Sequence, residues 1–336
     1  MLCSSRIKQA GEYLRNGGLV VFPTETVYGL GADAFNADAV ARIYSEKGRP
    51  GDNPLILHIA NIESFRELAL NPPEYAFALI EAFWPGPLTL VARKNPELPA
   101  WLGGHPGRVT ETIGIRMPAH PIAQELIEES KCIIAAPSAN KAGKPSPTTL
   151  AHVLEDFPQL HMALDGGSAK VGLESTVIDI TGENPVILRP GAITKEDVFK
   201  IIKTLRTASQ FSEDEKPRSP GMKYKHYAPR AAMTLVSGDS ENVAAYILDE
   251  DKTGAKIGVL INKKTLKYFQ NAPSNMEILL LGNDEKTIAQ NLFSRLREFD
   301  RLNVDLIFAE TTPENGLGVA IMDRMRKAAE GRIVYV

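Results

Sequence analysis

The sequence has few cysteines and no long apolar run, and each absence excludes a class of protein. Its 336 residues include two cysteines, Cys3 and Cys132, which lie far apart and in no metal-binding spacing. A disulfide scaffold or a zinc cluster is therefore not expected. No apolar run approaches the ~20 residues that a membrane span requires, and the N-terminus lacks the apolar core of a signal peptide. We expect a cytoplasmic protein, in a reducing setting and without membrane contact.

The common nucleotide-binding and hydrolase motifs are also absent. In Gly143–Pro145 a proline stands where a Walker loop needs serine or threonine, and Ser138 stands where it needs its first glycine. Gly29–Gly31 lacks the third glycine of a dinucleotide fingerprint, and no nucleophile elbow, HExxH or CxxC occurs. A nucleotide enzyme with this sequence would belong to a less common type.

The sequence also lacks a large excess of either positive or negative charge. The formal net charge is -3, with 24% charged and 43% hydrophobic residues, which is ordinary for a globular protein. This balance argues against a protein that acts mainly through a global basic field, although it allows a local basic pocket. The length suggests two domains, because single cores rarely grow beyond roughly 250–300 residues.

The first two thirds of the chain alternate apolar runs with amphipathic stretches, the pattern of an α/β domain with a mixed sheet. The expected helices are a short N-terminal one closed by Gly17-Gly18, then 37–47, 74–83 and 121–130. The expected strands are 19–22, 55–59, 88–92, 114–117, 132–135, 175–180 and 186–188. Long connections rich in proline and glycine join them, and such loops are usually functional or disordered.

A polar, charged stretch, TASQFSEDEKPRSP, then separates a second pattern from the first. Strands are expected at 233–236, 258–261, 278–281 and 305–309, and helices at 240–249, 284–302 and 320–329. Their order suggests a small parallel sheet of Rossmann-like type. The expected division is therefore a catalytic domain at 1–206, a linker and candidate active-site lid at 207–231, and a smaller α/β domain at 232–336.

Polar and basic groups collect where the strands of the first domain begin or end. The basic ones are Lys47, Arg49, Arg116, Lys141, Lys144 and Arg189. Together they suit a polyanion such as a nucleoside triphosphate, because arginine forks and lysine charges match phosphate oxygens. Taken singly, each is more typical of a solvated loop. His58, in an apolar strand, is by itself more typical of a satisfied core histidine.

The segment FPTETVYGLG, residues 22–31, ends the first expected strand with hydroxyls and glycines. Strand ends in open α/β sheets are where ligands bind. We therefore expect a ligand to bind at this strand end, and the glycines that follow to let the chain turn beside it.

Several long motifs, in order, resemble the YrdC-like L-threonylcarbamoyladenylate synthases. They are FPTETVYGLGADA, KGRPGDNPLILHI, WPGPLTLV, IGIRMP, APSANKAGKPSPT, ESTVID and ILRPGAI. The segment SPGMKYKHYAP and the Rossmann-like remainder resemble the long, two-domain form of the family. The resemblance covers nearly the whole chain. It implies a twisted, open mixed sheet with a large positive cavity in the first domain.

The resemblance also implies a reaction. Members of the family make threonylcarbamoyl-AMP and pyrophosphate from L-threonine, bicarbonate or CO2, and ATP. A separate tRNA threonylcarbamoyl transferase complex then uses the product to modify tRNA. The implied activity is that of a nucleotidyltransferase, and a stable complex with tRNA is not expected.

Site residues carry over from the resemblance position by position. The positions implied to hold L-threonine are Thr26, His58, Arg116, Ala136 and Ser175. Those implied to hold ATP are Arg49, Asn53, Thr112, Ser138, Asn140, Ser146, Arg189 and Tyr227. No covalent nucleophile is expected, and Lys47 and Arg49 are the electrostatic candidates for catalysis. Mg2+ is expected to arrive with ATP, because no dedicated carboxylate cage is visible.

Two other functions fit parts of the sequence. A module that binds tRNA or double-stranded RNA would use the same basic residues for phosphate contacts. The acidic net charge and the lack of aromatic residues between basic ones argue against it. A related carbamoyl transferase with another acceptor is the second alternative, and the two-domain layout favours the synthase over it.

Overall fold

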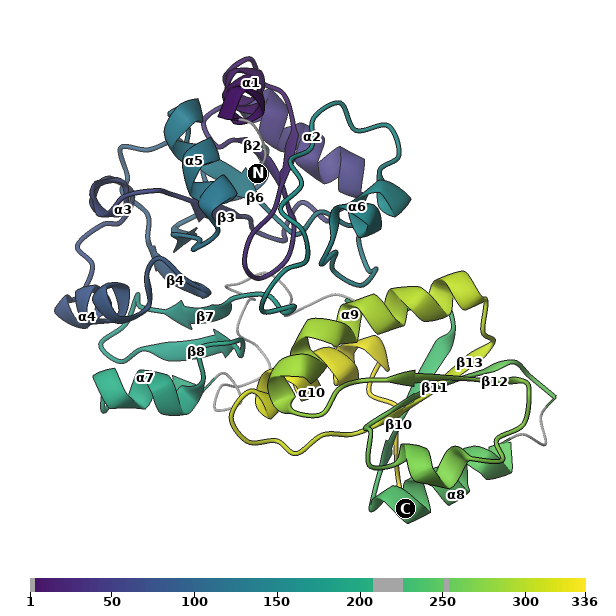
Figure 1. Cartoon of the computed structure of the whole chain (residues 1–336). Helices are drawn as coiled ribbons and strands as arrows, with labels where there is room; N and C mark the ends of the chain where they lie inside the picture. Colours follow the sequence, from purple (N-terminus) through teal and green to yellow (C-terminus); the bar gives the residue numbers. More distant parts are fainter. Residues whose placement is uncertain (1–3, 208–225, 251–253) are drawn as a thin grey trace. The chain divides into compact units, whose positions relative to one another are not determined.

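The computed structural model describes residues 4–207, 226–250 and 254–336. The chain folds into two compact units, which Figure 1 shows in the colours of the sequence. The first comprises Met1–Ala142 and Pro147–Lys223, and the second comprises Gly143–Ser146 and Tyr224–Val336. Most of the expected linker and lid, 207–231, lies outside the described residues.

The first unit is built on one nine-stranded sheet, in the order β1-β2-β6-β3-β5-β4-β7-β8-β9. The pairs β3–β5, β4–β7 and β8–β9 are parallel and the other neighbours are antiparallel. The strands are β1 (Val20–Phe22), β2 (Gly29–Asp33), β3 (Ile56–His58), β4 (Leu88–Arg93), β5 (Thr112–Arg116), β6 (Ile134–Ala136), β7 (Thr176–Asp179), β8 (Val186–Arg189) and β9 (Arg206–Thr207). The mixed sheet expected from the sequence is confirmed.

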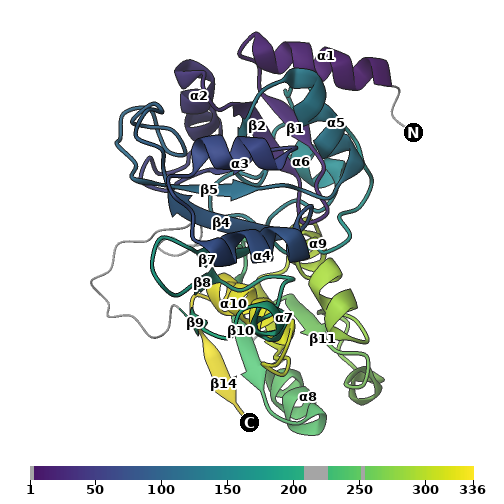
Figure 2. The ribbon, with the colours of Figure 1, turned by 90° about the vertical axis from the view of Figure 1, so that its left-hand side faces the viewer.

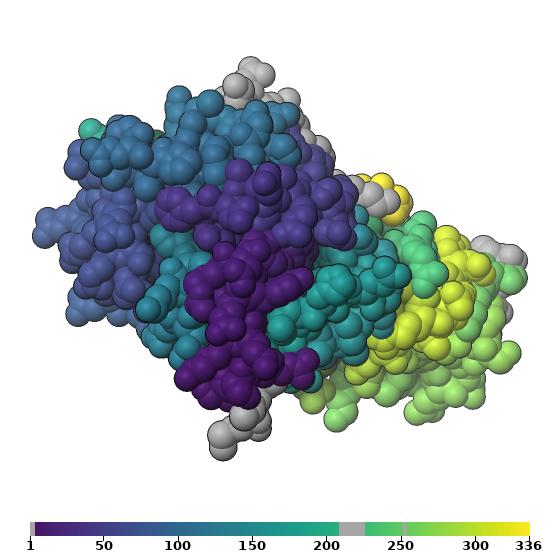
Figure 3. Space-filling model, turned by 90° about the horizontal axis from the view of Figure 1, so that it is seen from above, coloured from purple at the N-terminus to yellow at the C-terminus, as the bar shows by residue number. Residues whose placement is uncertain are grey.

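Helices pack on both sides of this sheet. They are α1 (Ser4–Arg15), α2 (Ala37–Lys47), α3 (Ile62–Leu68), α4 (Glu74–Phe83), α5 (Pro121–Ser130), α6 (Leu150–Asp156) and α7 (Lys195–Ile201). Buried side chains of α2, α3 and α4 form one core cluster with the sheet, and those of α1 and α5 form another. Figure 2 shows α1 beside α5. α1 lies at the surface, within the purple segment of Figure 3. Its buried residues are Ile7, Ala10, Gly11 and Leu14.

The boundaries of α2 follow from its sequence. The Asn36 side chain accepts a hydrogen bond from the backbone N–H of Ala39, which caps the start of the helix. Gly48 ends it in the left-handed region at φ 62°, where a residue without Cβ is least strained. These two signals are local, so the expected range 37–47 agrees with the structure.

The glycines after Thr24-Glu25-Thr26, which we name the T-E-T segment, do not make a turn, contrary to our expectation. Gly29 and Gly31 belong to β2, which pairs with β1. A Cβ on Gly31 would lie 2.6 Å from Ile134 Cγ2 and 2.8 Å from the Phe22 ring. Glycine is therefore needed because the Phe22 ring packs directly on the strand, and β2 was missed because two glycines in five residues disfavour a strand.

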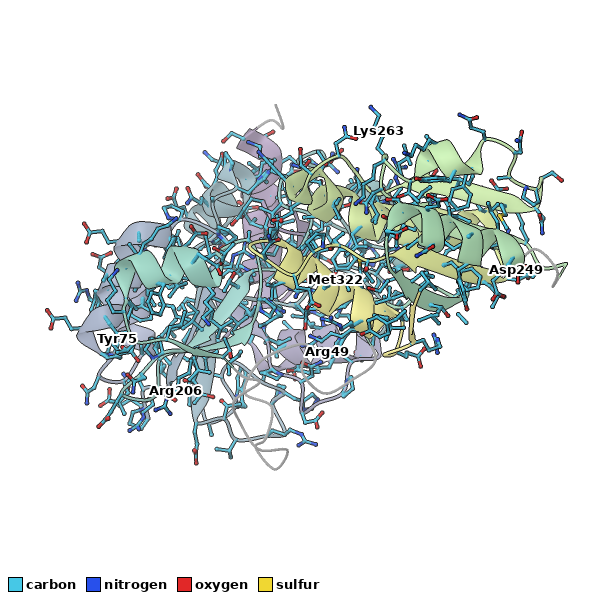
Figure 4. All side chains as sticks on the ribbon, turned by 90° about the horizontal axis from the view of Figure 1, so that it is seen from below. Arg49, Tyr75, Arg206, Asp249, Lys263 and Met322 are labelled. Atoms are coloured by element: carbon cyan, nitrogen blue, oxygen red, sulfur yellow. The ribbon has the colours of Figure 1, made fainter. Side chains whose placement is uncertain are left out.

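The second unit contains a five-stranded, fully parallel sheet in the order β12-β11-β13-β10-β14. Its strands are β10 (Ala232–Ser237), β11 (Ile257–Ile261), β12 (Met276–Leu280), β13 (Leu306–Glu310) and β14 (Ile333–Tyr335). Its helices are α8 (Ser240–Asp249), η3 (Leu266–Phe269), α9 (Glu285–Leu302) and α10 (Gly318–Ala328), which carries Met322 (Figure 4). The expected Rossmann-like α/β architecture is confirmed.

A short segment from the middle of the sequence, Gly143–Ser146, also belongs to the second unit. The buried Arg297 of α9 donates from Nη2 to the Pro145 carbonyl at 2.7 Å. The backbone N–H of Ala228 donates to the Gly143 carbonyl at 2.9 Å. The second unit therefore consists of two segments that are far apart in the sequence, and a single domain boundary cannot describe it.

No helix among the described ranges combines the length and the apolar character needed to cross a membrane.

Candidate functional site

Arg116, the last residue of β5, is the centre of a buried polar cluster with the T-E-T segment. Its side chain is 5% exposed and forms an ion pair with Glu25, with 2.6 Å between Nη2 and Oε1. Nη1 donates to the Thr26 hydroxyl at 2.8 Å, and Nε donates to the Gly86 carbonyl at 3.2 Å. A residue 90 positions away in sequence therefore meets Thr26 directly.

The Thr26 hydroxyl is oriented by its neighbour Thr24. The two hydroxyl oxygens lie 2.7 Å apart, and Thr24 Oγ1 donates to the Val27 carbonyl, also at 2.7 Å. Because the Thr24 proton is used on Val27, the proton between the hydroxyls belongs to Thr26. Thr26 donates to Thr24 and accepts from Arg116, so its oxygen keeps one lone pair that could accept from an ammonium, amine or hydroxyl group.

His58 lies beside Arg116 in the sheet, as its registered partner on β3. Its ring is buried, packs edge-on against Phe22 and donates from Nδ1 to the Ile56 carbonyl at 3.2 Å. Burial, and secondly the charge of Arg116, lower the pKa of His58 to about 3. His58 is thus a neutral, hydrogen-bonded histidine next to the cluster, and its contact with L-threonine stays a prediction.

The His58 ring is expected to remain neutral in the folded protein down to about pH 4. Its pKa is lowered from 6.5 to about 3, so the unfolded chain takes up a proton that the native state refuses. Stability should therefore fall as the pH drops from about 6.5 towards 3. An NMR titration of the imidazole signals would measure this, with a His58→Gln variant to assign the signal and the urea-unfolded chain as the reference. A midpoint near 6.5 in the folded protein would contradict it.

Ser175, directly before β7, forms a second polar cluster. Its hydroxyl lies 2.8 Å from that of Thr89 on β4, and both residues are fully buried. Arg189, at the end of β8, donates from Nε and Nη2 to the Ser175 carbonyl at 3.1 and 3.0 Å. A further bond of 3.2 Å joins Nη2 to the Ser175 hydroxyl. Arg189, predicted at the nucleotide, thus contacts the residue predicted at L-threonine.

Lys47 fixes the loop that follows β6. Its side chain is buried, and Nζ donates to the backbone carbonyls of Ser138 and Asn140. Within that loop the Ser138 hydroxyl donates to Asn140 Oδ1 at 2.6 Å. Ala136, before the loop, pairs with Ile56 of β3. The structure therefore brings Lys47 together with two of the residues predicted to hold ATP.

Arg49 follows Gly48, the residue that ends α2, and is labelled in Figure 4. Its Nη2 donates to Asn53 Oδ1 at 2.7 Å and to the Pro54 carbonyl at 2.8 Å. The Tyr44 hydroxyl donates to the Asn53 carbonyl at 3.1 Å, and burial raises the pKa of Tyr44 to about 12. Arg49 and Asn53, both predicted at the nucleotide, thus form one hydrogen-bonded unit.

The predicted residues lie at two ends of the same strands. β3 and β5 are parallel and end at His58 and Arg116. β4 runs antiparallel to β5 and parallel to β7, so Ser175 lies at that same end. Thr112 begins β5, and Asn53 precedes β3, at the opposite end. The two ends are about 13 Å apart along β5, from its residue spacing.

A cavity of about 1320 Å³ lies in the first unit. Its lining includes Thr89 and Gly114, and it extends to Thr112 and Pro54. This volume exceeds that of a typical small-molecule pocket, about 300–1,000 Å³. Its charged lining residues are Asp52, Arg93, Lys94 and Glu111. Two are basic and two acidic, so the positive character of the cavity stays a prediction.

Two predicted ATP residues belong to the second unit. Ser146 is buried in the segment Gly143–Ser146. Tyr227 is also buried and adopts φ 64°, with its ring centroid 5.2 Å from that of Phe293. The Arg324 guanidinium lies 5.7 Å from the Tyr227 ring centroid. Contacts of Ser146 and Tyr227 with a nucleotide stay predictions.

Comparison with known proteins identifies the family. Residues 12–191 match the Sua5/YciO/YrdC family model, which is described as "Telomere recombination". Residues 193–330 match the model described as "Threonylcarbamoyl-AMP synthase, C-terminal domain". The chain belongs to the Sua5/YciO/YrdC family. It has the long form, in which the second domain is present.

Relatives in this family match over nearly the whole chain. The threonylcarbamoyl-AMP synthase of Pyrococcus abyssi is 45% identical over 98% of this chain and 96% of its own length. That of Bacillus subtilis is 44% identical over 98% of this chain and 94% of its own. The solved structure of P. abyssi Sua5 complexed with L-threonine has a TM-score of 0.91, at 44% identity, and covers all of this chain and 97% of that one.

Two residues of the site were missed from the sequence. Glu25 lies within the T-E-T segment, but a single carboxylate has no informative spacing, so the sequence assigns it no role. Thr89 lies in the apolar strand LTLVAR, where the only signal is one hydroxyl among buried aliphatic residues. Both were found because tertiary contacts join them to Arg116 and Ser175.

Proposed function

We propose that this chain makes threonylcarbamoyl-AMP and pyrophosphate from L-threonine, bicarbonate or CO2, and ATP. The observation that carries the proposal is the buried Arg116 at the end of β5, which bonds to Thr26 and Glu25. A guanidinium fixed in this way can also receive a substrate carboxylate. Membership of the family supports the same reaction. The enzyme is a nucleotidyltransferase, because its product carries the AMP of ATP.

In the proposed reaction, the amine of L-threonine adds to CO2 and loses a proton to solvent, or condenses with bicarbonate and releases water, to give a carbamate. A carbamate oxygen then attacks the α-phosphorus of ATP, the bond to the β-phosphate oxygen breaks, and pyrophosphate leaves. The protein supplies alignment and cationic stabilisation rather than a nucleophile. We assign L-threonine to Thr26, His58, Arg116, Ala136 and Ser175, and the electrostatic role to Lys47 and Arg49.

The nucleotide is assigned to a second set of residues. These are Arg49, Asn53, Thr112, Ser138, Asn140, Ser146, Arg189 and Tyr227. Among those of the first unit, Arg49 with Asn53 and Lys47 with Ser138 and Asn140 are joined by hydrogen bonds. This supports a common role, because preorganised donors need little reorganisation when an anionic ligand binds.

Mg2+ is proposed to accompany ATP. Among the described residues, no group of three or more His, Cys, Asp or Glu side chains could hold a metal ion. The carboxylates beside the predicted nucleotide residues are Asp52 and Glu111, which line the cavity next to Asn53 and Thr112, and two carboxylates with amides and hydroxyls do not make the cage of a resident Mg2+. No step of the proposed reaction is therefore assigned to a protein-bound metal.

We propose that the product passes to a tRNA threonylcarbamoyl transferase complex in the cytoplasm. A mixed anhydride of carbamate and phosphate decomposes in water, so a second reaction has to use the product soon after it forms. The small net charge of -3 supports a protein that does not hold tRNA stably by itself.

The test is pyrophosphate release by the purified full chain, with L-threonine, bicarbonate and ATP supplied together or with one omitted. Release should need all three and should be well above that with L-serine. Binding of RNA without threonine-dependent release would reject the proposal in favour of an RNA-binding module. Release with another carbamoyl acceptor in place of threonine would favour a related transferase.

Arg49→Ala is expected to weaken ATP binding by about 1.5–3 kcal/mol, roughly 10- to 150-fold, because a charge-assisted contact is lost. Binding of L-threonine should change little. Calorimetry with ATP and with L-threonine measures the two effects separately. Arg66→Ala is the matched control, because Arg66 is exposed on α3. Unchanged affinity for ATP would remove Arg49 from the site.

A further inference from the structure

Glu25 is a buried acidic residue to which the proposed reaction assigns no task. It lies between the two threonines of the T-E-T segment and is 8% exposed. Burial of a carboxylate is costly unless it is paired and hydrogen-bonded. The hydrogen-bond partners of the Glu25 carboxylate therefore indicate why an acidic residue is buried at this position.

Both carboxylate oxygens of Glu25 have a partner. Oε1 accepts from Arg116 Nη2 at 2.6 Å. Oε2 accepts from the backbone N–H of Ala119 at 3.1 Å, in the loop between β5 and α5. Because the second bond is to backbone, Glu25 has a fixed anchor on one side and holds the guanidinium on the other.

The guanidinium of Arg116 is held at three points. Nε donates to the Gly86 carbonyl, Nη1 to the Thr26 hydroxyl and Nη2 to Glu25. An arginine has five N–H donors, so these bonds leave one on each terminal nitrogen. Two N–H groups on the terminal nitrogens of a fixed fork match the two oxygens of a carboxylate.

We propose that Glu25 is a positioning residue, which sets the plane of the Arg116 guanidinium so that its two remaining N–H groups receive the carboxylate of L-threonine. The inference rests on the proposed function. Glu25 does not touch the substrate, and it acts through the direction of the two N–H bonds. Its length matters because it must reach from the Ala119 backbone to Nη2.

A purely neutralising role would have a different signature. In that case any negative charge near Arg116 would suffice, and the shape of the side chain would matter little. Glu25→Asp keeps the charge but is one methylene shorter, so it cannot hold both Ala119 and Arg116. Glu25→Gln loses the charge but keeps an oxygen at the same distance from Nη2, giving up only the Ala119 contact.

The experiment measures KM for L-threonine and for ATP by pyrophosphate release, with the full chain of each variant. We expect Glu25→Asp to raise KM for L-threonine about 10-fold or more, because the Arg116 guanidinium would no longer be aligned with the substrate carboxylate. Glu25→Gln should raise it about 3-fold, because the bond to Arg116 remains. KM for ATP should stay within about 2-fold in both. Glu12→Ala, on the exposed face of α1, is the control.

The order of the two variants decides the proposal. A larger rise for Glu25→Gln than for Glu25→Asp would show neutralisation and overturn positioning. Equal rises in both KM values would show a general structural role and also overturn it. If the unsubstituted chain releases no threonine-dependent pyrophosphate, the proposed function itself fails. In that case calorimetry would measure the affinity for L-threonine directly, and Glu25→Asp should weaken it more than Glu25→Gln.

Discussion

Arg116→Ala is expected to weaken L-threonine binding by at least about 2 kcal/mol, roughly 30-fold, and to leave ATP binding little changed. The guanidinium carries the charge-assisted bonds assigned to the substrate carboxylate, and such bonds contribute about 1.5–3 kcal/mol each. Of the residues that the structure describes, Arg116 is the cation that bonds to both Glu25 and Thr26, so its loss leaves the pair without a positive charge. Calorimetry with each substrate in turn measures the two affinities.

The same substitution should also destabilise the fold, by about 3–5 kcal/mol, because Glu25 is left buried without its cation. Arg116→Lys separates the two effects. It keeps a charge near Glu25 but cannot donate in the planar, two-pronged geometry, so it should retain stability better than threonine affinity. Arg6→Ala, exposed on α1, is the control. Equal weakening of threonine and ATP would show that Arg116 is wrongly assigned.

Gly191→Ala is expected to cost about 2–3 kcal/mol of folding stability and to weaken L-threonine binding. A Cβ on Gly191 would lie 2.3 Å from the Thr176 nitrogen, 2.7 Å from the Ser175 carbonyl carbon and 2.8 Å from the Glu174 oxygen. All three are backbone atoms, so no side chain can rotate aside, and overpacking of this kind is destabilising. The backbone at Glu174, Ser175 and Thr176 has to shift, and the Ser175 hydroxyl moves with it.

Urea denaturation and KM for L-threonine together test this second prediction. Gly182→Ala is a matched control in the turn between β7 and β8, because the nearest atom to its Cβ would lie 3.8 Å away. That control should change neither quantity beyond about 0.5 kcal/mol. Unchanged stability of the Gly191→Ala variant would contradict the prediction, because it would mean that the backbone around Ser175 can move to accept the added Cβ at little cost.

Much of the fold could be predicted from local patterns. The ranges expected for α2, α4, α5 and α8 agree with the structure. Apolar periodicity and capping residues such as Asn36 depend only on residues close together in the sequence. Short elements were missed, among them α3, α6, α7 and β14. Each has seven residues or fewer, which is too short for periodicity to distinguish it from a loop.

The site was only partly predictable. The order of long motifs indicated the family, and the family indicated which residue types meet which substrate. The sequence could not show that Glu25 holds Arg116 or that Thr89 pairs with Ser175, because these partners are 91 and 86 positions apart. Nor could it show that Gly143–Ser146 belongs with the C-terminal unit.

The sequence by itself therefore determined the α/β class, the two-part organisation and the family, because these follow from composition, periodicity and contiguous motifs. Only the tertiary structure decided how the polar residues are used: Glu25 and Thr26 fix Arg116, Arg189 and Thr89 fix Ser175, and Lys47 fixes the loop at Ser138. The physical reason is that a buried charge or hydroxyl is defined by its partner, and partners are chosen by the folding of distant segments into one sheet.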